Sequence, residues 1–440
     1  MRNRLEQVKD SLFFVPAIYI IGAAFLAWGL NRIDSSAVPQ DLVFLLPTSL
    51  EGARLVFSTV ASATITVSAL VFSITAISVQ LASDYSPRVL GEFLRDSFQK
   101  NVVGWVSATF TFALLSLATL GAEPTQAAEG NVASWAATTA VILAVGSVLA
   151  IVAFIDRTTT RVRVEHIVRR ISASSSAAMR NHFSDQSTDI ASEGWELAPD
   201  TDSTTVRATD SGWVRRIRPR ELLAELQPGM VARIDVRVGD YVTVDDRLLT
   251  VWQSEEAEEV DLGGSSILIG PSRSSDHDPG FGLRQLLDIA LRALSPGIND
   301  PGTAVAVVYH LVEPLRVALT GYPRSRFFHD GDRHVAMPLA SDREDFVRDT
   351  LAELRQALGG QVLVATAMVD IIGSLKEQLR DSALDERSRV LDKELELLLE
   401  EIDTWDLLSA DREPIIRTLR RKRLMDGLAD DAPAVAWLEG

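Results

Sequence analysis

The chain has 440 residues and a formal net charge of −17, from 43 basic and 60 acidic side chains. This length is too great for one ordinary core, and an acidic chain argues against nucleic acid as a partner, since phosphate binding requires clustered positive charge. Because the chain contains no cysteine, disulfides, thiolate metal ligands and thiol catalysis are excluded.

Four apolar segments contain no Asp, Glu, Lys or Arg, and each is close to the roughly 20 residues that a bilayer-spanning helix needs. Together they explain why 47% of the residues are hydrophobic although 23% are charged. The sequence predicts an integral membrane α-helical domain over residues 1–155, with the lipid bilayer as its first partner. The four transmembrane helices are expected at about 11–30, 55–82, 102–120 and 133–155.

Basic residues near the ends of the spans predict the orientation, because Lys and Arg are retained on the cytoplasmic side. The loop between the third and fourth spans, 121–131, has no Lys or Arg, whereas the three segments on the other side do. We therefore expect a multi-pass protein of the cytoplasmic (inner) membrane with both termini cytoplasmic. The basic residues on that side are Arg2, Arg4, Lys9, Arg88, Arg95, Lys100, Arg157, Arg161, Arg163, Arg169 and Arg170.

Small and polar residues recur along one face of the second span at heptad spacing. Close packing of membrane helices explains such a face, because small residues and hydroxyls let backbones approach. A second interpretation is that copies of this helix line a hydrophilic pore. The spans contain no ionisable group, which argues against an ion-coupled carrier. The face, called the polar seam below, consists of Thr59, Ser62, Thr66, Ser73 and Gln80.

After the last span we expect a helical extension and linker over 156–202, and then a small β module over 203–260. The alternation in SGWV, VRVGDYV and DDRLLTV resembles the biotinyl/lipoyl-type barrel-sandwich module. No lysine occurs between Thr201 and Val260, which excludes attached biotin or lipoate, so docking or oligomer contact is the expected use. A mainly helical cytoplasmic domain should fill 261–440, giving an α+β region overall.

The stretch ALSPGINDPGTA, residues 293–304, interrupts two amphipathic helices of that domain. Pro296 should end the first helix, because the residue before proline avoids helical dihedrals. Asp300 should cap the second helix, with Pro301 at its first position. Asn299 beside Asp300 leaves other roles open: an anion at the helix N-terminus, a cation on the side-chain oxygens, or a cap for a neighbouring subunit. We treat Asn299 and Asp300 as a candidate ligand or gate corner.

A β-hairpin is expected near 326–335, with Asp330-Gly331 as its turn. Two histidines and two aspartates there could bind a metal, although polar residues are also usual at hairpin tips. Ser341 and Glu344 predict a capping box for the next helix. The sequence has no Walker loop, HExxH, GxSxG or Rossmann fingerprint, so we expect neither an enzyme nor a cofactor. The hairpin residues concerned are His329, Asp330, Asp332 and His334.

Two motifs, RALSPGINDPGTA preceded by DIAL and VQLASDYSPRVL after the second span, carry a resemblance to a known family. They closely resemble a widespread bacterial family of predicted membrane proteins, domain of unknown function 2254. The resemblance extends over nearly the whole chain, including the four spans and the β segment. It implies this architecture and brings no established activity.

Two functions follow from these features. The first is a homo-oligomeric pore or channel, lined by the polar seam and gated by the cytoplasmic domain. The second is a membrane-anchored scaffold or ligand sensor without transport, in which the seam only packs helices and the corner at Asn299 and Asp300 binds a ligand or partner.

Overall fold

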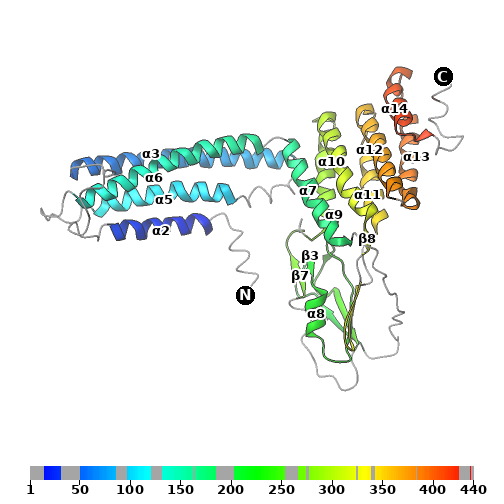
Figure 1. Ribbon diagram of the computed structural model, residues 1–440, viewed down its shortest axis with the longest axis horizontal. Helices are drawn as coiled ribbons and strands as arrows, with labels where there is room; N and C mark the ends of the chain where they lie inside the picture. Colours follow the sequence, from blue (N-terminus) through cyan, green and yellow to red (C-terminus); the bar gives the residue numbers. More distant parts are fainter. Residues whose placement is uncertain are drawn as a thin grey trace. The chain divides into compact units, whose positions relative to one another are not determined.

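The computed structural model divides the chain into two compact units, residues 1–163 and 164–440, here called the N-terminal and C-terminal units (Figure 1). Each unit is described by itself. The structure describes residues 14–30, 50–85, 97–119, 131–161, 164–184, 203–252, 266–273, 277–323, 326–337, 342–382, 384–425 and 437.

The described part of the N-terminal unit is helical, in agreement with the prediction. Its helices are α2 (Phe14–Leu30), α3 (Leu50–Tyr85), α5 (Ser97–Thr119) and α6 (Asn131–Arg161). The last three contain windows long and apolar enough to cross a membrane, whereas α2 is a shorter apolar helix of 17 residues. Residues 11–13 of the first predicted span lie outside the described ranges.

Helix α5 packs against α2, α3 and α6. Two glycines permit the close approach: a Cβ on Gly104 would lie 2.7 Å from the Tyr19 ring, and one on Gly146 would lie 2.8 Å from the Trp105 ring. The buried hydroxyls of Thr109 and Ser147 are 3.0 Å apart and bond to each other across α5 and α6. Close backbone approach and paired hydroxyls are the means by which helices associate in lipid.

The C-terminal unit contains helices around α10 (Pro301–Thr320), which packs against α7, α9 and α12. A window of α10 is also long and apolar enough to cross a membrane. However, Val307, Leu311 and Leu315 are fully buried, so in this fold α10 is the core helix of its unit. The other helices are α7 (Val164–His182), α8 (Pro219–Glu225), α9 (Pro279–Leu294), α11 (Arg343–Gln356), α12 (Val362–Asp381), η2 (Asp385–Ser388), α13 (Arg389–Asp403) and α14 (Ser409–Arg421).

Two sheets form the β part of the C-terminal unit. One has five strands in the order β2-β6-β4-β10-β9, and the other has three in the order β5-β3-β7. A separate two-stranded pair joins β1 to β8. The strands are β1 (Phe183–Ser184), β2 (Ser203–Arg207), β3 (Gly212–Ile217), β4 (Val231–Ile234), β5 (Tyr241–Val242), β6 (Arg247–Trp252), β7 (Ile267–Gly270), β8 (Tyr322–Pro323), β9 (Phe327–Asp330) and β10 (Arg333–Ala336).

One apolar core joins the two larger sheets, with Val214 of the small sheet and Leu249 and Val335 of the large sheet all buried in it. Three strands of these sheets come from beyond residue 260, namely β7, β9 and β10. Strands β9 and β10 form a hairpin, and β10 runs parallel to β4. The expected boundary at 260 therefore separates strands that pair with one another in each of the two sheets. The likeness to a barrel-sandwich remains a prediction.

Two local predictions near the hairpin are off by one residue. Arg333 pairs with Asp330, so the turn residues are Gly331 and Asp332; Gly331 has a φ of 62°, as the first turn position of a type II′ hairpin requires. The capping box of α11 is made by Asp342 and Asp345. Ser341 lies outside the described residues. An aspartate pair can replace a Ser/Glu pair because each carboxylate can accept a backbone N–H.

Candidate functional site

The polar seam lies on the side of α3 that no other described helix of the N-terminal unit covers. All five of its residues are exposed, whereas Phe57, Val60 and Val71 on the opposite side are buried against the neighbouring helices. A helix with 3.6 residues per turn separates the two sets onto different faces. Packing against another described helix of the N-terminal unit therefore does not account for the seam. Contact with a second copy and the lining of a pore both remain predictions.

The hydroxyls of the seam are partly satisfied within the helix. Thr66 Oγ1 donates a hydrogen bond to the Ser62 carbonyl, at 3.1 Å. A hydroxyl that donates to its own backbone keeps its two lone pairs, so it presents an acceptor outward. Such oxygens can serve as ligands for water or a cation that passes along the helix.

A polar contact not expected from the sequence lies near one end of the seam. Gln99 Nε2, in the first turn of α5, donates to Thr75 Oγ1 of α3 at 3.2 Å. Phe98, the residue before Gln99, makes a second contact: the Arg157 guanidinium of α6 lies 4.6 Å from the centre of its ring. These contacts connect three helices at the end where basic residues accumulate. The sequence signal was an amide and an aromatic residue at the very start of an apolar span.

The corner at Asn299 and Asp300 has the structural role predicted for it. Helix α9 ends at Leu294, and Asp300 caps α10 by accepting from the Thr303 N–H at 3.1 Å and the Thr303 hydroxyl at 2.6 Å. Pro301 occupies the first helical turn. The helix stop followed by a helix start is thus confirmed.

Asn299 connects this corner to a second helix. Its φ of 47° is in the left-handed region, which Asn tolerates better than most residues. Its Oδ1 accepts from Gln361 Nε2 at 2.9 Å, and Gln361 is the N-cap residue of α12. Asp300 therefore caps a helix, Asn299 bonds to the side chain of the residue that precedes another helix, and both are exposed. A ligand or gating role for them remains a prediction.

We expect Asp300→Ala to destabilise the C-terminal unit by about 1 kcal/mol, the usual cost of losing an N-cap. The hydrogen bond from the Thr303 hydroxyl, and then that from its N–H, lower the pKa of Asp300 below its ordinary 3.8. Because the pKa is lowered in the fold, this stabilisation is present above pH 3.8 and is lost as the pH falls through the folded pKa. Denaturation of the full-length protein in detergent at several pH values measures both effects.

The control is Asp300→Asn, since Asn is an equally good cap without a titrating carboxyl. This variant should keep the stability at neutral pH and lose the contribution of Asp300 to the acid dependence. Equal destabilisation by both substitutions would contradict the capping role.

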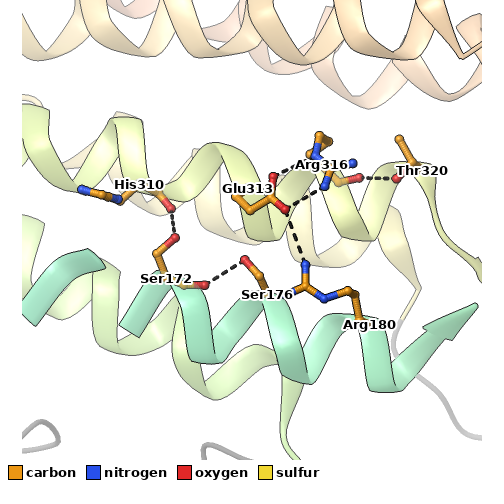
Figure 2. A network of polar contacts seen from close by, with 7 residues as sticks. All are labelled: Ser172, Ser176, Arg180, His310, Glu313, Arg316 and Thr320. Carbon is orange, nitrogen blue, oxygen red and sulfur yellow. Dashed lines mark hydrogen bonds and ion pairs between the residues drawn. The ribbon is translucent and has the colours of Figure 1, made fainter. Parts of the chain in front are cut away.

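A polar network between α7 and α10 was also not foreseen (Figure 2). Ser172 Oγ of α7 donates to the His310 carbonyl of α10 at 2.6 Å. Glu313 of α10 accepts from Arg316 at 2.7 and 2.8 Å and pairs with Arg180 of α7 at 3.5 Å. The bond from Arg316 is the main cause that lowers the pKa of Glu313. The network fixes α7 to the core helix, and its sequence signal was the serine run at 172–176.

The hairpin histidines face each other across the two strands. His329 and His334 are a registered pair, and their ring centres are 6.3 Å apart. Burial, followed by the neighbouring His329, lowers the pKa of His334. Among the residues that the structure describes, no three His, Asp or Glu side chains are grouped as a metal site would require.

Comparisons with known proteins agree with the membrane architecture. Uncharacterized proteins of Mycobacterium bovis and Mycobacterium tuberculosis are 28% identical to this chain over 403 residues, which cover 87% of it and 75% of theirs. No solved structure matches the chain significantly. The model of the family described as "Predicted membrane protein (DUF2254)" matches residues 9–374, and the chain therefore belongs to that family.

Proposed function

We propose that this protein is a non-enzymatic, homo-oligomeric pore in which copies of α3 line the conduction path. The observation that carries the proposal is the exposure of the whole polar seam in the single chain. Its small and hydroxyl side chains are free to meet a second copy or water, which are the two environments that suit them.

The neighbouring helix α6 shows what a lipid-facing surface of this unit contains. Its exposed side chains include Ile142, Leu149 and Val152, which are large and apolar. The exposed side of α3 is divided instead: Ile65 and Phe72 continue such a surface, while the seam beside them is small and polar. A helix that contacted only lipid on this side would be expected to carry large apolar residues over the whole exposed surface.

The C-terminal unit is suited to act as the gate. Helix α6, which contains the candidate span Trp135–Arg157, ends at Arg161, and α7 begins at Val164, so only two residues separate the two helices. Helix α7 is in turn fixed to α10 by the network of Ser172, Glu313 and Arg180. In this proposal a displacement of α6 is passed along the chain to the core of the C-terminal unit. In this proposal that unit is cytoplasmic, since the basic residues lie on its side of the spans.

The test is potassium and chloride efflux from liposomes that contain the full-length protein. We expect Ser73→Leu to reduce the efflux at least about tenfold, because a branched apolar side chain both narrows and dehydrates a pore. The matched control is Phe72→Leu, the adjacent exposed residue outside the seam, which should conduct as the parent does. A size measurement in detergent must give the same oligomer for all three proteins.

Unchanged efflux in a well-assembled Ser73→Leu protein would contradict the proposal. If neither ion leaves the vesicles faster than from protein-free liposomes, the scaffold or ligand sensor becomes the better account. The seam would then serve only to hold copies together.

A further inference from the structure

The C-terminal unit contains a cavity of about 570 Å³ that none of the predicted sites includes. This volume is within the range of small-molecule sites, roughly 300 to 1,000 Å³. The end of α7, the β4–β5 turn, the start of α9, the β9–β10 hairpin and the first turns of α11 all contribute to its lining. Ligand sites commonly form where several elements meet in this way.

One wall of the cavity is built rigidly around Asp278, whose side chain is only 3% exposed. Arg273 donates to both of its carboxylate oxygens, at 2.6 and 2.9 Å, and the Phe281 N–H donates at 3.1 Å. Gly239 closes over this pair with a φ of 96°, and a Cβ there would lie 2.7 Å from Asp278 Oδ2. The wall is therefore formed before any ligand arrives.

Each acidic side chain of the lining contacts an arginine, whereas one lining arginine, Arg326, has no ion pair with any residue that the structure describes. Asp278 is held by Arg273, and Asp345 and Asp349 both accept from Arg348. Asp240 accepts from the Arg237 backbone N–H at 2.8 Å and also forms a longer ion pair with the Arg237 guanidinium at 3.6 Å, in which both side chains are partly exposed.

Arg326 enters the cavity from the start of the hairpin and is half-buried. None of the ion pairs found among the described residues involves it. Partial burial of a guanidinium is unfavourable where no opposite charge lies beside it, and no described side chain forms an ion pair with Arg326. An anion bound at Arg326 would remove that penalty.

The cavity also offers a surface for a flat apolar group. Phe183 and Phe346 pack edge to face with ring centres 6.3 Å apart, and the half-buried Phe328 and Met337 lie along the same lining. Aromatic side chains of this kind favour stacked or edge-to-face contact with another ring.

We propose that this cavity binds a small organic phosphate with a flat aromatic body, the chemistry of a nucleoside monophosphate. Arg326 would hold the phosphate, with Arg237 as a second donor. Two guanidinium groups suit a phosphate better than a carboxylate, because a phosphate has three oxygens and up to two negative charges. The aromatic lining would take the base. This site does not depend on whether the protein conducts ions.

The test is isothermal titration calorimetry of the full-length protein in detergent with AMP, adenosine and inorganic phosphate. AMP should bind at one site per chain, and adenosine and phosphate should each bind at least about tenfold more weakly, because each lacks half of the recognised chemistry. Arg326→Ala should weaken AMP binding by about tenfold or more. It should not lower the melting temperature of the free protein, since none of the ion pairs found among the described residues involves Arg326.

The matched control is Arg333→Ala, on the next strand of the same hairpin. Arg333 pairs with Asp330 and does not line the cavity, so this variant should bind AMP as the parent does. Absence of AMP binding at AMP concentrations up to about 1 mM would overturn the proposal. Equal binding by Arg326→Ala, or equal affinity for adenosine and AMP, would overturn it as well. Since conduction is not measured, such a failure would leave the proposed pore untouched.

Discussion

Arg387→Ala is expected to destabilise the C-terminal unit by about 3 kcal/mol, the range for breaking a buried, charged hydrogen-bond network. Arg387 lies in η2, the short helix that comes after α12 in the chain. Its side chain reaches the end of the core helix α10. Its Nη1 donates to the carbonyls of Leu319 and Gly321, at 2.7 and 3.0 Å. The guanidinium also lies 4.6 Å from the centre of the Tyr322 ring.

The physical reason is that the last carbonyls of a helix have no partner within the helix, and a cation there also opposes the negative end of the helix dipole. Arg387 is 9% exposed, so water cannot easily take over these bonds after truncation. Denaturation of the full-length protein in detergent measures the loss. Arg389→Ala, two residues away and exposed, is the control and should change stability by less than about 0.5 kcal/mol. Equal effects of the two substitutions would show that Arg387 does not hold the end of α10.

Features decided by nearby residues were predictable from the sequence. The apolar segments that form α3, α5 and α6 follow from length and hydropathy alone. The Asp-Pro start of α10 and the glycines that follow α11 follow from local capping rules: Gly359 and Gly360 have φ values of 54° and 86°. Such signals depend on a few consecutive residues, so no knowledge of tertiary contacts was needed.

Features decided by contacts between distant residues were not predictable. The parallel pairing of β10 with β4 joins residues about a hundred positions apart, and the residues of neither strand indicate which strand it pairs with. The contacts of Arg387 with α10 and the cavity beside Arg326 also arise only when separate elements meet. The polar seam is intermediate, because its spacing was visible while its exposure required the packed helices.

A second large effect is expected when a residue of the polar seam is modified chemically, and the absence of cysteine from the chain allows one position to be modified at a time. The protein has no cysteine, so Ser73→Cys introduces a single thiol. A water-soluble, positively charged thiol reagent modifies a thiol that faces water far more readily than one that faces lipid, because the thiolate is the reactive form and requires a polar environment. Phe72→Cys, on the adjacent exposed position, provides the comparison.

The measurement that tests the pore most directly is potassium efflux from liposomes containing Ser73→Cys, recorded before and after treatment with this reagent. The account predicts that Ser73→Cys is modified and that its efflux falls to nearly that of protein-free vesicles, since a fixed positive charge in a narrow pore repels cations. The Phe72→Cys protein should continue to conduct. Unchanged efflux from fully modified Ser73→Cys protein, or a thiol at position 73 that the reagent cannot reach, would contradict a pore lined by α3.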